Sequence, residues 1–186
     1  MKTLIYIMAL SVIFITACGN NNRLDRTTQT GVIKTVSDSA KNASRTTLFN
    51  LYFKLKNSFA ADNDTDAANA AKEMIAAFAG FKANSLTPEQ SKAFSEIKED
   101  ATEHVSHISA NAGNIVHQRE HFDMLSKDMY DLAKLTGTGQ VIYVDHCPMY
   151  NHNKGALWLS EVKEIRNPYM GKAMPVCGKI QEELKL

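Results

Sequence analysis

Apolar residues recur every three or four positions between residues 44 and 135, the spacing that gathers them on one face of an α-helix. Breaks before Asp64 and at Gly80, Gly113 and Gly137 divide this segment into four amphipathic helices. Short connections between such helices predict a mainly α fold, an antiparallel up-and-down four-helix bundle. The main stripe residues are Leu48, Leu51, Tyr52, Leu55, Phe59, Met74, Ile75, Phe78, Phe94, Ile97, Ala101, Val105, Ile108, Ile115, Phe122, Leu125, Met129 and Leu132.

The third helix has a clear start at Thr87-Pro88-Glu89-Gln90, with Thr87 as N-cap, Pro88 at the first helical position and Gln90 placed for a capping box. After Gly139 the pattern changes to two short β-prone runs, at residues 141–144 and 156–159. We expect them to pair as a small hairpin or to lie against the helices. We therefore expect residues 44–186 to form a single domain, a helical bundle with a short cap of β-strands and loops at residues 138–180.

The N-terminus resembles a bacterial lipoprotein signal. Lys2 precedes an apolar run of residues 3–17, which is too short to span a bilayer and is typical of a signal peptide over residues 1–17. Ile15-Thr16-Ala17-Cys18 resembles a lipoprotein box, which predicts that Cys18 carries lipid and anchors the chain to a membrane of the cell envelope, facing the periplasm. The alternative is an ordinary signal peptide cleaved near Ala17. The polar segment within residues 18–43 is then expected to be a flexible linker.

Charge argues against one class of partner. The chain has 21 Lys and Arg, 20 Asp and Glu and a net charge of +1, and it lacks basic blocks. Such a balance does not favour binding to nucleic acid or an electrostatic attachment to a membrane surface.

Sulfur ligands are concentrated between residues 145 and 178. Pro148 favours an extended Cys147, and an extended chain would turn Cys147 and Met149 to the same side. Pro175 does the same to Met174, and Gly178 allows Met174 and Cys177 to form a short knuckle. One thiolate and one thioether on each arm suit Cu(I) or Ag(I) better than Ca²⁺ or Mg²⁺, and Zn²⁺ becomes suitable if histidine joins.

A disulfide is the alternative for the same two cysteines. In the oxidising envelope a bridge between Cys147 and Cys177 would close a loop of about thirty residues and contribute roughly 3 to 4 kcal/mol. The residues alone leave a metal site and a disulfide staple both open, although the neighbouring methionines favour the metal.

The C-terminal motif resembles that of a known family. The residues Cys147-Pro148-Met149, Gly155 to Ser160, Glu164 to Tyr169, Gly171, Met174 and Cys177-Gly178 look like an uncharacterised bacterial domain, common in Bacteroidetes as small lipoproteins and as a C-terminal extension of heavy-metal (copper and silver) efflux adaptor subunits. The resemblance covers roughly residues 45 to 183. It implies copper or related soft-metal handling in the envelope, a heavy-metal efflux complex as partner and no enzymatic activity. The alternative is a structural or interaction domain, stapled by a disulfide between Cys147 and Cys177, that docks to such an efflux adaptor without binding metal itself. The family pattern falls on Cys147, Met149, Met174 and Cys177, with His146 and Met170 only as auxiliary candidates.

Histidines supply the remaining candidate ligands. His117 and His121 are four residues apart, so they share one face of the fourth helix and can chelate a metal. His104 and His107 end the third helix, and a turn at Gly113 would place His104 roughly across from His121 in a local cluster. His117 and His121 are therefore expected to supplement the sulfur ligands, and His152 to be exposed. A nucleophilic cysteine enzyme is not favoured, because no helix N-terminus precedes Cys147 to lower its pKa.

Overall fold

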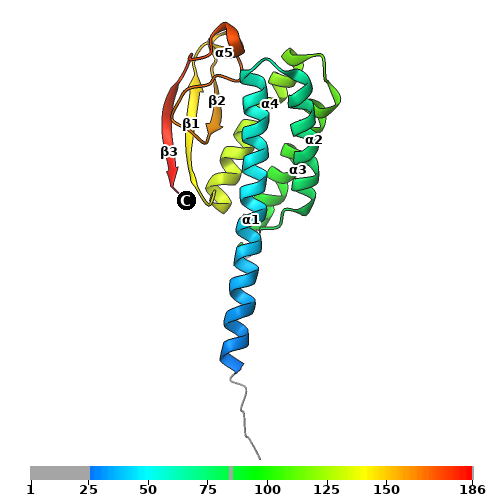
Figure 1. Cartoon of the computed structure of the whole chain (residues 1–186), viewed down its shortest axis with the longest axis vertical. Coiled ribbons are helices and arrows are strands. Elements are labelled where there is room, and N and C mark those ends of the chain that lie inside the picture. Colours follow the sequence, from blue (N-terminus) through cyan, green and yellow to red (C-terminus); the bar gives the residue numbers. More distant parts are fainter. Residues whose placement is uncertain (1–25, 84–85, 186) are drawn as a thin grey trace, which may run out of the picture.

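The computed structural model describes residues 26–83 and 86–185, with side chains described from residue 43 onward. It is mainly helical, with a small antiparallel sheet at the C-terminus (Figure 1). The elements in chain order are α1 (Arg26–Ala60), α2 (Asp64–Gly80), α3 (Pro88–Ala110), α4 (Ile115–Thr136), β1 (Val141–Cys147), α5 (Tyr150–Asn153), β2 (Ala156–Ser160), the 3-10 helix η1 (Gly171–Ala173) and β3 (Lys179–Lys185).

Each long helix packs against the next one along the chain. Their apolar stripes meet in one core, in which residues such as Leu55, Phe59, Met74 and Phe122 are fully buried. The predicted start of α3 is confirmed, because Thr87 and Gln90 form the capping box, with each side chain bonded to the other residue's backbone. The predicted ends of α2 and α4 are likewise close to those observed.

The first helix differs from the expectation. The predicted linker within residues 18–43 is helical from Arg26 onward, and this part of α1 projects away from the rest of the molecule (Figure 1). Extending an existing helix costs less than starting one, and residues 26–43 contain no proline to stop it. The predicted signal peptide, the lipidation site Cys18 and residues 19–25 lie outside the described residues. Among the helices that are described, none is long and apolar enough to cross a membrane.

The C-terminal sheet has three strands in the order β2-β1-β3. The hairpin predicted from the sequence contained the first two strands and lacked β3. Both predicted β-prone runs are strands, and β1 continues to Cys147. Both neighbours run antiparallel to β1, with His146 opposite Leu157 on β2 and opposite Lys179 on β3. The sheet packs on the helices mainly through β2 and α4. Trp158 of β2 and Tyr169 are buried, and the Tyr169 ring contacts Phe122 of α4.

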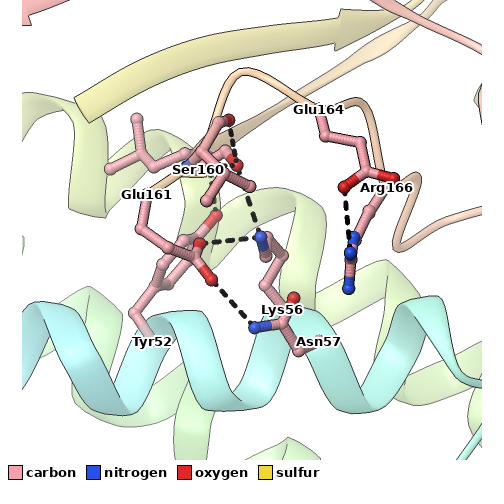
Figure 2. Close-up of polar contacts among 9 residues, drawn as sticks. Tyr52, Lys56, Asn57, Ser160, Glu161, Glu164 and Arg166 are labelled. Carbon is pink, nitrogen blue, oxygen red and sulfur yellow. Dashed lines mark hydrogen bonds and ion pairs between the residues drawn. The ribbon is translucent and has the colours of Figure 1, made fainter.

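A buried ion pair joins α1 to the end of β2. The Lys56 side chain is fully buried, and its Nζ lies 2.8 Å from Glu161 Oε2. Figure 2 shows Asn57, from the next position of α1, donating to the other carboxylate oxygen of Glu161 at 3.0 Å. Burial alone would raise the pKa of Glu161, but the hydrogen bonds from Lys56 and Asn57 outweigh it and lower that pKa.

Asp145 of β1 lies near this pair without a hydrogen-bond partner of ordinary geometry on either carboxylate oxygen. Burial raises its pKa to about 6, while the charge of Lys56 opposes the rise. Because burial disfavours the ionised form of this carboxyl group, we expect its titration to make the stability of the sheet depend on pH.

Candidate functional site

Four histidines gather where the C-terminal half of α3 meets the N-terminal half of α4. The turn at residues 111–114 brings the two helices side by side, with Asn114 capping α4 through the backbone N–H of His117. His104 and His107 come from α3, and His117 and His121 come from α4. The predicted local cluster is therefore present, and it includes His107, which the sequence placed nearby but did not single out as a ligand.

The rings of this histidine group are in mutual contact. One ring nitrogen from each of His107, His117 and His121 can be chosen so that all three lie within 4.8 Å of one another. The His107 and His121 rings stack, with centroids 4.2 Å apart and planes 5° from parallel. His104 Nδ1 lies 3.2 Å from His121 Nδ1, so the His104 ring contacts the group through His121 without supplying one of the three close ring nitrogens.

Three of these rings also contact a carboxylate. His107 Nε2 lies 3.9 Å from Glu103, His117 Nδ1 lies 3.4 Å from Glu120 and His104 Nε2 lies 3.8 Å from Asp128. Carboxylates next to histidines in this way orient the rings of metal sites and fix which nitrogen carries the proton. The first two pairs follow helical spacing, i,i+4 and i,i+3, so the positions of Glu103 and Glu120 in the sequence already indicate these contacts.

For two members of the group, His104 and His121, the surroundings favour the neutral imidazole. Burial lowers the pKa of His121, and the neighbouring histidines His107, His117 and His104 lower it further. Burial also lowers the pKa of His104, while nearby Glu103 and Asp100 oppose the shift. A neutral imidazole has a free lone pair for a metal ion, so these rings are prepared for coordination near neutral pH.

An open acidic groove of about 610 Å³ runs between α3 and α4 beside His104. Asp128 lines the groove and also faces His104, and burial together with Asp100 and Asp131 raises its pKa to about 7. Negative charge along the groove raises the local concentration of cations next to the histidine group. The acidic residues that line it are Glu96, Asp100, Asp128 and Asp131.

The two cysteines form a separate pair. Cys147, at the end of β1, is fully buried, and its Sγ lies 3.3 Å from Sγ of Cys177, just before β3. Cys147 is extended as Pro148 predicts, and the backbone N–H of Cys177 donates to the Met174 carbonyl, which gives the predicted knuckle. Neither cysteine belongs to a set of three or more His, Cys, Asp or Glu ligands in the part of the chain that the structure describes.

The loop before β3 is fixed by one buried amide. Asn167 donates from Nδ2 to the Cys177 carbonyl at 2.5 Å and accepts from the backbone N–H groups of Tyr169 and Met170. Gly178 has a φ of +151°, and a Cβ there would lie 2.8 Å from the Trp158 ring. These contacts hold Cys177 against Cys147. The sequence drew attention to Gly178, and it placed Asn167 within the Glu164 to Tyr169 motif without indicating that its side chain holds the loop.

Of the two predicted methionine ligands, Met149 departs from the expected backbone conformation. Met149 has helical backbone angles at the start of α5, and its side chain is 46% exposed. The extended conformation of Cys147 therefore does not continue to Met149, although the sequence predicted that both side chains would face the same side. Met174 is half-buried next to η1. The auxiliary candidate His146 lines an open groove with Cys177, whereas Met170 packs against the core. His152 is exposed, as expected.

Comparison with known proteins gives one match. The model of a family described as "Protein of unknown function (DUF3347)" matches residues 48–141. The matched segment contains the whole histidine group and ends before both cysteines. No curated protein and no solved structure matches the chain.

Proposed function

The chain belongs to the DUF3347 family, and from that premise we propose that it is a metal-binding protein of the cell envelope whose metal centre is the histidine group of α3 and α4. The observation that carries this proposal is the approach of three ring nitrogens, from His107, His117 and His121, to within 4.8 Å of one another. A tetrahedral ion with bonds of about 2.0 Å needs its nitrogens roughly 3.4 Å apart. Small rotations of exposed and half-buried rings can close that difference.

The donor set selects the class of ion. Three imidazoles suit Cu(II) or Zn²⁺, whereas Mg²⁺ and Ca²⁺ prefer oxygen ligands. Three protein ligands leave at least one coordination position free, which an ion needs in order to be passed on to a partner. This revises the expectation from the sequence, which made histidine an auxiliary to sulfur.

The neighbouring carboxylates indicate which nitrogens would bind. Glu120 contacts His117 Nδ1 and Glu103 contacts His107 Nε2, so His117 Nε2 and His107 Nδ1 remain for the ion. His104 contacts His121 Nδ1, which leaves His121 Nε2 free. His104 and Asp128 would then act as positioning residues behind His121.

A soft ion at the cysteine pair is the second candidate. The 3.3 Å separation of the Cys147 and Cys177 sulfurs supports it, because two thiolates this close can share one Cu(I) or Ag(I) ion. The two predicted thioethers belong to residues close to the pair in the chain. Met174 accepts a hydrogen bond from the backbone N–H of Cys177, and Met149 follows Cys147 by two residues.

The wider setting follows from the N-terminal sequence. Lipid on Cys18 would hold the domain at a membrane facing the periplasm, with the projecting part of α1 as a spacer. The packing of each long helix on the next supports an antiparallel up-and-down bundle as the scaffold. Buffering the ion, or delivering it to a heavy-metal efflux complex, is the role we propose for such a tethered site.

Titration calorimetry with separate Cu(II), Zn²⁺ and reduced Cu(I) titrations tests both candidates. We expect one equivalent of Cu(II) or Zn²⁺ to bind wild-type protein, and binding to weaken at least a hundred-fold in a His117→Ala, His121→Ala double variant. His152→Ala, an exposed histidine outside the group, is the matched control and should bind as wild type. Unchanged affinity in the double variant would refute the histidine site. Loss of Cu(I) binding in Cys147→Ser alone would support the second candidate.

A further inference from the structure

Cys147 and Cys177 can also form a disulfide bond, a reaction that requires no metal ion. Their two sulfur atoms, from residues thirty positions apart, already lie 3.3 Å from each other. Closing a disulfide bond of about 2.0 Å requires a further approach of little more than 1 Å. Both residues are free thiols in this structure.

The two thiols differ in accessibility. Cys147 is fully buried under the sheet, whereas Cys177 is half-buried and lines an open groove of about 350 Å³ together with His146, Pro148 and Lys179. A small disulfide reagent can therefore reach the Cys177 sulfur from solvent but cannot reach Cys147 directly. Rates of thiol–disulfide exchange depend on this access as well as on the thiolate fraction.

We propose that Cys147 and Cys177 form a reversible dithiol–disulfide site in which Cys177 reacts first with an exogenous disulfide and Cys147 completes the bridge. The Cys177 thiolate attacks one sulfur of a reagent such as oxidised glutathione, and one glutathione leaves as its thiolate. The Cys147 thiolate then attacks the Cys177 sulfur and releases the second glutathione. Two electrons pass from the protein thiols to the reagent, and the two thiol protons are taken up by the two released glutathione molecules.

The position of the pair determines which parts of the fold a disulfide bond would connect. β1 and β3 are already paired next to it, with His146 opposite Lys179. A covalent bond between Cys147 and Cys177 would enclose α5, β2 and the loop fixed by Asn167, while leaving α3 and α4 outside the closed loop. The histidine group would therefore keep its geometry in both redox states, whereas a soft ion could bind the cysteine pair only in the reduced state.

Thiol–disulfide exchange proceeds through a thiolate, and an ordinary cysteine thiol ionises at about pH 8.5. We therefore expect bridge formation to accelerate between about pH 7 and pH 9.

The test is peptide mapping of the full-length protein after incubation with oxidised glutathione, with free thiols blocked by iodoacetamide. Wild-type protein should yield a linked pair of peptides containing Cys147 and Cys177, and a reductant should separate them. The closed form should melt roughly 5 to 10 °C higher than the reduced form. Alkylation of both Cys147 and Cys177, with no linked peptide after incubation at pH 9, would overturn the proposal.

Single variants test the order of the two steps. Cys147→Ser should accumulate a mixed disulfide with glutathione at Cys177, because the resolving thiol is missing. Cys177→Ser should carry at least ten-fold less glutathione at Cys147 after the same time, because that sulfur is buried. Equal labelling of the two variants would contradict the assigned order.

Discussion

The histidine group and the cysteine pair bring donor atoms together by different means. The histidines lie on two consecutive helices joined by a turn at residues 111–114, so helical spacing and one short connection determine their meeting. The cysteines meet because β1 and the turn before β3 are aligned by strand register, by Asn167 and by Gly178. The first cluster is local in the sequence and partly open to solvent, whereas the second is non-local and partly buried.

This difference predicts that the histidine group and the cysteine pair respond to different perturbations. The histidine group should respond to pH and to loss of ligands while the fold stays intact, because its rings lie at the side of the core. The cysteine pair should respond to any change that disturbs the sheet. Variants that affect both clusters equally would contradict this division.

The largest expected effect is that of pH on metal affinity. Imidazoles bind metal only when neutral, and each ligand loses roughly ten-fold in affinity per pH unit below its pKa. Burial lowers the pKa of His121, so this ligand contributes less to the loss than a fully exposed histidine. We expect Cu(II) or Zn²⁺ affinity to fall at least a hundred-fold between pH 7.5 and 5.5, measured by competition with a chelator of known pH dependence. Constant affinity down to pH 5.5 would indicate ligands other than histidine.

The next effect separates a ligand from a positioning residue. His121→Ala should weaken metal binding about a hundred-fold, because it removes one of three ligands. His104→Ala should cost about ten-fold, because His104 contacts His121 Nδ1 without belonging to the group of three. His104→Gln, which can still hydrogen-bond to His121, should recover most of that loss. If His104→Ala weakens binding as strongly as His121→Ala, then His104 is itself a ligand.

The helical half of the molecule was largely predictable from the sequence. The start of α3 follows from the local chemistry of Thr87 and Gln90, and the histidine cluster follows from spacing along helices whose order in space matches their order in the chain. Such features need only short-range information. His107 joined the group because its ring stacks on His121, a choice of side-chain orientation that spacing does not determine.

The sheet half was harder to predict because its structure depends on distant partners. The segment Lys179–Lys185, rich in Lys, Glu and Leu, favours helix by intrinsic propensity but forms β3 by pairing with β1. Glu182 of this strand also accepts a hydrogen bond from Tyr130 of α4 at 2.8 Å. In the same way, Pro148 correctly indicated an extended Cys147, but the helical backbone of Met149 depends on how α5 begins.

Gly178→Ala tests how far the cysteine pair depends on this packing. The added Cβ would lie 2.8 Å from the Trp158 ring and 3.1 Å from the His146 carbonyl, at a φ that disfavours side chains. We expect a loss of roughly 2 to 4 kcal/mol in the free energy of unfolding and slower bridge formation, with metal binding at the histidines unchanged. Chemical denaturation and the peptide mapping described above measure the two effects.

Gly80→Ala is the matched control for that variant. A Cβ at Gly80 has nothing within 4 Å, and the position ends α2. Alanine there should be neutral or stabilise the protein by up to about 1 kcal/mol. A similar loss of stability in both glycine variants would mean that the Trp158 contact does not hold Cys177 in place.

The smallest expected effect comes from Asp145, two residues before Cys147 on the same strand. Burial raises its pKa to about 6, against the opposing charge of Lys56. Because the folded-state pKa lies above the ordinary value near 4, the folded protein holds this proton more tightly than the unfolded chain. The resulting stabilisation is present below about pH 4 and is lost as the pH rises to about 6.

Asp145→Asn removes that titration. Its stability relative to wild type should therefore increase by roughly 1 to 2 kcal/mol between pH 4 and 6 and change little above that range. The histidines titrate in both proteins, so their contribution cancels in the difference. Glu99→Gln, a change of an exposed carboxylate on α3, corrects for net charge. Urea denaturation at a series of pH values measures the difference. A difference that stays constant from pH 4 to 7 would show that Asp145 ionises in the folded protein as readily as in the unfolded chain.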